Sequence, residues 1–377
     1  MARYPAVVLE GPKELHLREL SIEKPLAKGE VLLEVAYAGV CGTDVSIARG
    51  DYPVPLPLVL GHEVSARVVD AKAGSEAAAL VGEAVVCEIN NSCAAYGLAR
   101  QCEACRRGMA THCLRRTVMG IINHAGGFAR YLRAPAGNLH RIPRGFSKKA
   151  AVLVEPLAAA LRTFELSPIA GGEVVVVLGC GRLGRLVALA ASSLGARVVA
   201  VGRSGQHLDL IAPFAWKRVS LPRADEPQEA GASAGGGEPS KTRGRAGVIA
   251  VKGEDELVTL IRDLTGGLGA DIVVEATSNN ERLKLAQKLA RPLGTVAMKS
   301  TSGVPVGALD TTRAAVDEVR FQGSRCGPFD KALRFMKKHG APSEAWITKT
   351  FPLERAAEGI MAAQTEPKVV IEVAPSI

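Results

Sequence analysis

The 377-residue sequence lacks the features that mark membrane, secreted and nucleic-acid-binding proteins. It has no apolar run of about 18 residues, so no transmembrane helix is expected. Its first residues, MARYPAVVLEGPKELHL, lack the apolar core and small-residue cleavage site of a signal peptide. Aromatic residues make up only 4% of the chain and the basic residues are dispersed, so the net charge of +9 does not indicate a nucleic-acid surface. We therefore expect a soluble cytoplasmic protein with neither nucleic-acid nor membrane partners.

Cysteines are also few, but they are clustered. Five of the eight lie between Cys87 and Cys113. Cytoplasmic thiols are mostly reduced, so such clustering favours a metal site over disulfides. Cys102-x2-Cys105-x7-Cys113, with Cys93 upstream, offers four thiolates, the ligand set of a closed and therefore structural zinc site. A disulfide pair or free thiols is the alternative.

The hydrophobic pattern changes partway along the chain. Residues 1–150 hold short β-like runs separated by Gly, Pro and polar turns, which is typical of an all-β unit. After them strand-like and helix-like runs alternate, beginning with EVVVVLG and LGRLVALAASSLG, which indicates a parallel α/β sheet. Residues 222–246 are rich in Gly, Ala, Ser and Pro and predict a flexible inserted loop. Two amphipathic helices, near 330–338 and 354–363, and the strand KVVIEV follow.

A glycine-rich turn, GCGRLG, follows the first strand of the α/β part and opens a helix. In that context the spacing Gly179-x-Gly181-x-x-Gly184 predicts that the turn binds the pyrophosphate of a dinucleotide at the helix N-terminus. Arg182 and Leu183 belong to the same predicted site.

The ribose carboxylate expected about 20 residues further on is missing. The second strand, RVVAV, ends instead in Gly202, Arg203 and Ser204. A carboxylate would repel a 2′-phosphate, whereas Arg203 can pair with it and Ser204 can hydrogen-bond to it. The sequence therefore favours NADP, and use of both NADP and NAD is the alternative.

Three further motifs supply side chains suited to a catalytic metal. GVCGTD contains Cys41, LGHEV contains His62 and Glu63, and VEPLAAAL contains Glu155. A thiolate, an imidazole and a carboxylate are good ligands for four-coordinate zinc with one open position. Sequence spacing does not bring them together, and a buried cysteine or a core histidine is the alternative for each taken singly.

In this order GVCGTD, GHE, the cysteine cluster, VEPLA and GCGRLG resemble the zinc-dependent medium-chain alcohol dehydrogenases. The resemblance covers nearly the whole chain except residues 222–246. It implies an α/β protein with a GroES-like catalytic domain over residues 1–155, to which residues 305–377 partly return. A Rossmann-type doubly wound domain would occupy residues 156–304.

The same resemblance implies roles for the site residues. Cys41 and His62 would hold a catalytic zinc, completed by Glu63 or Glu155, and Thr43 would take the substrate proton. The four clustered cysteines would hold a structural zinc. The family's spacing there is C-x2-C-x2-C-x7-C, so AAYGLARQ lengthens this chain's cluster by six residues.

The activity implied is hydride transfer between the CH–OH group of an alcohol, polyol or sugar and NADP or NAD, in a homodimer or homotetramer. Aldose 1-dehydrogenase and threonine dehydrogenase-like activities use the same site. A zinc-free quinone reductase and a non-enzymatic NADP-binding protein are more distant alternatives.

Overall fold

The structure is a computed structural model that describes residues 3–22, 25–72, 75–203, 205–222, 247–277, 279, 281–300, 307 and 309–376. Ser204 and, apart from residue 222, the predicted inserted loop lie outside the described residues. Within them, no helix is both long and apolar enough to cross a membrane. The chain divides into two compact units: Met1–Ala159 with Cys326–Ile377, and Ala160–Arg325.

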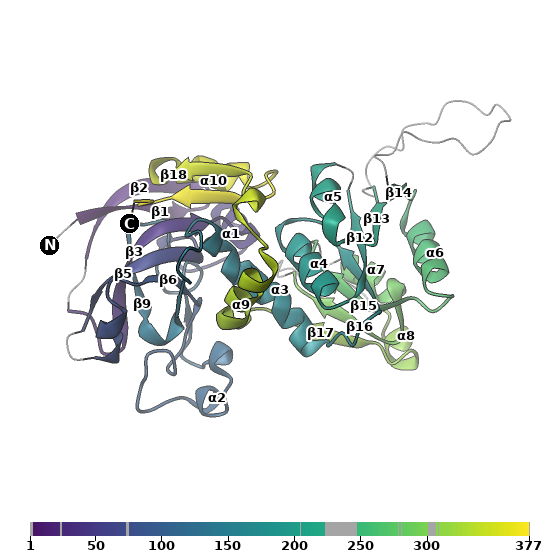
Figure 1. The fold of residues 1–377 in the computed structure, drawn as a ribbon, viewed down its shortest axis with the longest axis horizontal. Helices are drawn as coiled ribbons and strands as arrows, with labels where there is room; N and C mark the ends of the chain where they lie inside the picture. Colours follow the sequence, from purple (N-terminus) through teal and green to yellow (C-terminus); the bar gives the residue numbers. More distant parts are fainter. Residues whose placement is uncertain are drawn as a thin grey trace. The chain divides into compact units, whose positions relative to one another are not determined.

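The first unit is built on mostly antiparallel β-sheet, with one parallel pair near the C-terminus. Its strands are β1 (Arg3–Gly11), β2 (Glu14–Ser21), β3 (Glu30–Gly39), β4 (Leu58–Val59), β5 (Glu63–Ala71), β6 (Ala84–Cys87), β7 (Asn90–Asn91), β8 (Thr117–Val118), β9 (Tyr131–Pro135), β10 (Leu139–Arg141), β18 (Lys349–Pro352) and β19 (Val369–Glu372). The main sheet has the order β10-β6-β5-β3-β19-β18, and β9 also pairs with β3. Figure 1 shows the C-terminal strands (yellow) beside the N-terminal ones (purple). Strand β3 therefore has partners from both ends of the chain.

Short helices flank these strands. They are α1 (Gly42–Arg49), α2 (Glu103–Arg106), α9 (Phe329–His339) and α10 (Ala356–Ala362). Helices α9 and α10 occupy the two segments that the amphipathic pattern indicated. Helix α3 (Val154–Leu166) begins in the first unit and continues into the second.

The second unit is a parallel sheet with the strand order β14-β13-β12-β11-β15-β16-β17. Its elements are β11 (Val174–Leu178), α4 (Arg182–Ser193), β12 (Arg197–Gly202), α5 (Gln206–Leu210), β13 (Lys217–Ser220), β14 (Val248–Ala250), α6 (Glu254–Leu264), β15 (Ala270–Glu275), α7 (Arg282–Leu289), β16 (Ala290–Met298), α8 (Thr311–Val316) and β17 (Arg320–Gly323). Every residue of β11 is buried, as expected for a strand covered on both faces. The α/β prediction is thus confirmed.

Strand order reverses around β11, which lies between β12 and β15. In open parallel sheets, ligands bind at the carboxyl ends of the strands at such a reversal. The glycine-rich turn follows β11 directly, so the fold places it at the expected ligand position.

Of residues 305–377, expected to return partly to the first unit, the part that belongs to it begins at Cys326. The reason is β17, a short edge strand that pairs in parallel with β16. Its four residues, RFQG, carry no clear strand pattern.

Candidate functional site

The glycine-rich turn has the geometry of a phosphate cradle. Gly179 has φ +97°, a left-handed conformation that favours glycine, and a Cβ there would lie 2.7 Å from the carbonyl oxygen of Ala276. A Cβ at Gly184 would collide with the carbonyl oxygen of Gly179. A Cβ at Gly181, the N-cap of α4, would meet no atom within 4 Å. The backbone is therefore open at the helix N-terminus, where a pyrophosphate can approach N–H groups.

The end of β12 lies against this turn. The Gly179 N–H donates to the carbonyl oxygen of Val201 at 2.8 Å, and a Cβ on Gly202 would lie 2.9 Å from the Cys180 sulfur. Arg203 follows at an exposed position. Ser204, also predicted to bind the cofactor, lies outside the described residues.

The loop between β3 and α1 carries Cys41, which caps the helix. The Cys41 N–H donates to Oδ2 of Asp44 at 2.8 Å, and the Gly61 N–H donates to Oδ1 of the same carboxylate at 3.1 Å. Asp44 is fully buried. One carboxylate thus joins the two loops that carry Cys41 and His62.

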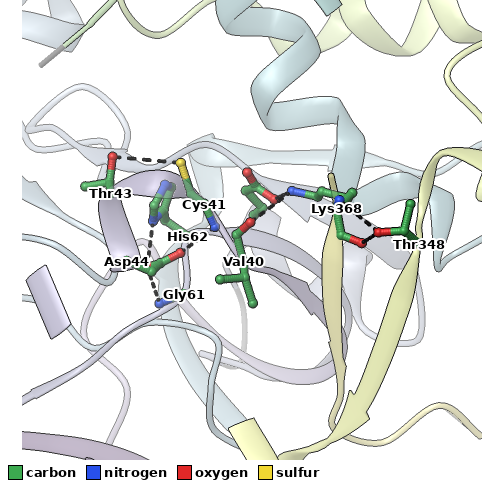
Figure 2. Close-up of polar contacts among 9 residues, drawn as sticks. Val40, Cys41, Thr43, Asp44, Gly61, His62, Thr348 and Lys368 are labelled. Carbon is green, nitrogen blue, oxygen red and sulfur yellow. Dashed lines mark hydrogen bonds and ion pairs between the residues drawn. The ribbon is translucent and has the colours of Figure 1, made fainter. Parts of the chain in front are cut away.

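His62 is buried beside Cys41 and Asp44 (Figure 2). Its Nδ1 lies 3.3 Å from Oδ1 of Asp44 but makes no well-aligned hydrogen bond. Burial lowers the pKa of His62, but the charges and hydrogen bonds of Asp44 and Cys41 outweigh it, so the pKa lies well above its ordinary value. A metal bound by this imidazole would have to displace that proton. A carboxylate behind a histidine is also a common device for orienting a metal ligand.

The half-buried Thr43 completes this group. Its Oγ1 lies 3.8 Å from the Cys41 sulfur. The structure therefore brings together Cys41, Thr43 and His62, three of the predicted site residues, and adds Asp44, to which the sequence gave no role.

The carboxylate of Glu63 is paired with a lysine and does not join Cys41 and His62. It forms a buried ion pair with Lys368, whose Nζ also lies 3.5 Å from the carbonyl oxygen of Val40. Thr348 holds the backbone of Lys368: its hydroxyl donates to the Lys368 carbonyl at 3.0 Å and accepts from the Lys368 N–H at 3.1 Å. Figure 2 shows Lys368 and Thr348 apart from Cys41 and His62. Sequence analysis gave no role to Lys368.

Glu155 is buried in the first turn of α3, in the same unit as Cys41 and His62. Among the described residues, Cys41, His62, Glu63 and Glu155 do not form a group with all ligand atoms within 4.8 Å; only the four clustered cysteines do so. The structure thus gathers part of the predicted catalytic set and holds Glu63 away from it.

The four-cysteine lobe (Cys93, Cys102, Cys105 and Cys113) is compact. The Cys93 sulfur lies 3.3 Å from that of Cys113 and 3.6 Å from that of Cys105, and Cys102 lies 3.6 Å from Cys113. Tetrahedral zinc with Zn–S bonds of about 2.3 Å requires sulfurs about 3.8 Å apart. All four cysteines are free thiols. The donor set therefore fits a structural zinc, and the lengthened spacing does not keep Cys93 from the others.

The lengthening folds as a turn packed on the domain. Gly29 has φ +80°, and a Cβ there would collide with the carbonyl oxygen of Tyr96. The Gly137 N–H donates to the carbonyl oxygen of Ala95 at 3.1 Å. These contacts let eight residues intervene between Cys93 and Cys102 while the two sulfurs stay together.

Backbone amides and burial shift the pKa values of two cysteines in this lobe in opposite directions. The N–H groups of Cys105 and Leu114 lower the pKa of Cys102 to about 6, whereas burial raises the pKa of Cys105 to about 12. Cys102 therefore exists as a thiolate near neutral pH, while Cys105 would lose its proton only on binding a metal.

Two family models match this chain. Residues 27–144 match the alcohol dehydrogenase GroES-like domain, and residues 183–338 match the zinc-binding dehydrogenase domain. The chain is 31% identical to a 2-dehydro-3-deoxy-L-galactonate 5-dehydrogenase of Pseudoalteromonas atlantica, over 86% of this chain and 85% of that protein. It is 27% identical to a sorbitol dehydrogenase of Halalkalibacterium halodurans, over 86% of each.

Solved structures share the fold over almost the full length. A structure described as a zinc-binding dehydrogenase from Sinorhizobium meliloti bound to NADP aligns with a TM-score of 0.80 at 23% identity, over 99% of this chain and 100% of that one. The 2R,3R-butanediol dehydrogenase of Bacillus subtilis aligns with a TM-score of 0.76 at 24% identity, over 98% and 99%. Together with the matched domains and relatives, this shows that the chain belongs to the zinc-dependent medium-chain alcohol dehydrogenase family of oxidoreductases.

Proposed function

We propose that this chain interconverts a secondary hydroxyl group of a polyol or sugar acid and the corresponding ketone, with NADP as cofactor and with zinc held by Cys41, His62 and Glu155. The observation that carries the proposal is the half-buried Cys41 beside the buried His62, which is backed by Asp44. The choice of substrate class is supported by relatives named for sorbitol and for a sugar acid.

The donor set fits zinc. A thiol, an imidazole and a carboxylate are its ordinary ligands, and three of them leave a position open. Glu63 is paired with Lys368, so we assign the third ligand position to Glu155. When bound, zinc supplies a Lewis acid for the substrate oxygen and the nicotinamide supplies the hydride acceptor.

The surrounding side chains have two roles: they orient the zinc ligands, and they accept the proton of the substrate. Asp44 fixes the imidazole of His62 through Nδ1 and, by accepting from the Cys41 and Gly61 amides, fixes both loops. The Thr43 hydroxyl is placed to accept the proton of a substrate hydroxyl at Oγ1. We infer that this proton would leave Thr43 through water.

The preference for NADP is supported by the end of β12. Gly202 and Arg203 occupy the place of the usual ribose carboxylate. A charge-assisted hydrogen bond from Arg203 to a 2′-phosphate is worth about 1.5–3 kcal/mol. We also propose that the chain works in the cytoplasm, where its eight free thiols stay reduced, and that it forms a homodimer or homotetramer.

A substrate panel tests the proposal. Oxidation of alcohols, polyols, sugar acids, aldoses and threonine is measured with NADP and with NAD, before and after treatment with a chelator. We expect turnover of polyols or sugar acids with NADP, lost on chelation and restored by zinc. If the protein oxidises only aldoses at C1, or only threonine, the proposed substrate class is wrong. If the activity is insensitive to the chelator, the proposed role of zinc is wrong.

Substitution of Cys41 tests the site itself. We expect Cys41→Ala to lose turnover while its circular dichroism spectrum stays that of the wild type. Cys326→Ala, at a half-buried cysteine outside the proposed site, serves as a matched control. A fully active Cys41→Ala protein would exclude Cys41 as a zinc ligand.

A further inference from the structure

Four basic side chains gather at the start of the second unit's α4 and α5. Arg182 and Arg185 belong to the first turn of α4, Arg203 directly follows β12, and His207 is in α5. The sequence assigned Arg203 to the 2′-phosphate and Arg182 to the pyrophosphate site, whereas neither Arg185 nor His207 has a role in the proposed function. The cluster is a strong concentration of positive charge beside the phosphate cradle.

The backbone places α5 against the cradle. A Cβ on Gly202 would touch both the Cys180 sulfur, at 2.9 Å, and Cδ2 of Leu208, at 3.5 Å. Cys180 belongs to the glycine-rich turn and Leu208 is the buried neighbour of His207. The turn, the end of β12 and α5 therefore form one packed corner, and His207 lies on the helix of that corner.

The charges around His207 are mostly of one sign. Burial lowers the pKa of His207, and Arg182, Arg203 and Arg185 lower it further by repulsion. Burial also lowers the pKa of Arg185 to about 10.

The acid on α5 does not offset this charge. Asp209 lies 3.4 Å from the guanidinium of Arg218 on β13, which also donates to the carbonyl oxygen of Leu208. A dianion is the ligand that would compensate the three arginine charges and favour a proton on His207.

We propose that His207 is a specificity-determining residue: with Arg182, Arg185 and Arg203 it binds the 2′-phosphate of NADP, and its protonation on binding makes the preference for NADP over NAD grow as the pH falls. This inference rests on the proposed use of NADP. The 2′-phosphate favours the imidazolium form, so NADP binding takes up a proton at His207. NAD has no group to place there and binds without this uptake.

The test uses fragments that isolate the phosphate. The affinities of the full-length zinc-loaded protein for 2′,5′-ADP and for 5′-AMP are measured by calorimetry between about pH 6 and about pH 8.5, the range in which histidine titrates. The phosphate itself titrates near pH 6, so wild type and His207→Gln are compared at each pH. His16→Gln, an exposed histidine in β2, is the matched control.

We expect His207→Gln to weaken 2′,5′-ADP binding about tenfold near pH 6, the factor of one charge-assisted hydrogen bond, and less than about twofold near pH 8.5. Binding of 5′-AMP should not change. His207→Lys should keep tight binding of 2′,5′-ADP and lose the pH dependence that the imidazole adds. If His207→Gln does not fold, His207→Lys is used in its place.

Two negative outcomes are distinguishable. If 2′,5′-ADP binds more tightly than 5′-AMP but the wild type and both His207 variants share one pH profile, His207 does not contact the phosphate and NADP use stands. If the wild type binds 2′,5′-ADP no more tightly than 5′-AMP at any pH, the proposed preference for NADP is itself wrong.

Discussion

Asp44 links the two loops of the candidate catalytic site, and replacing it by asparagine tests that link. Its two oxygens accept from the Cys41 and Gly61 amides, and Oδ1 also faces Nδ1 of His62. Asparagine has only one oxygen. Whichever way its amide is turned, a backbone N–H of one loop meets an NH₂ group and loses its acceptor.

The magnitude follows from burial. Asp44 is fully buried, so the unmatched N–H costs about 1–3 kcal/mol. The remaining bond becomes a neutral one, which is weaker than its charged counterpart by about 1 kcal/mol. We expect Asp44→Asn to lower the free energy of unfolding by about 2–4 kcal/mol. Loss of the carboxylate behind His62 should also weaken zinc binding about 10- to 100-fold.

Two measurements check this prediction. Urea unfolding gives the stability, and competition with a chromogenic chelator gives the zinc affinity of the catalytic site. Asp51→Asn is the control, since Asp51 lies on the surface near the same helix and pairs with Arg49. An Asp44→Asn protein with wild-type stability and zinc affinity would refute the role assigned to the carboxylate.

Three other predictions concern charges described above. Lys368→Met leaves Glu63 buried without its partner and should reduce the free energy of unfolding, measured in urea, by about 3–5 kcal/mol. An unchanged urea midpoint would show that the ion pair does not contribute to stability. In zinc-free protein, Cys102 should be the first cysteine of the lobe alkylated by iodoacetamide. Its rate should rise through about pH 6, because its pKa is lowered to about 6 and the thiolate is the reactive form; mass spectrometry that finds Cys105 modified first would contradict this. Arg203→Ala should raise KM for NADP about tenfold or more and leave KM for NAD unchanged; equal changes would exclude contact with the 2′-phosphate.

The fold could be predicted from sequence because its signals are local. The alternation of strands and helices after residue 173 and the glycine-rich turn are read from neighbouring residues, and both are found in the structure. Strand β17 was not predicted because it is four residues long at a sheet edge, where burial imposes little pattern.

The candidate site was predictable only in part, for the same reason. Cys41 and His62 lie in recognisable motifs. Asp44 had a signal, an acid at the third position of a helix, which indicates a cap, but its contact with Gly61, 17 residues further on, depends on tertiary structure. Lys368 lies 305 residues from Glu63, and no local pattern could pair them.

The position of β19 between β3 and β18 has a consequence for the order of folding. A chain synthesised from its N-terminus has all of Ala160–Arg325 available before β19 exists. The last residues of β3, just before Cys41, pair with β19 and lack that partner until then. The parallel sheet is thus the first unit able to fold completely during synthesis. The loop that presents Cys41 gains its final support only when Lys368 and β19 have emerged from the ribosome.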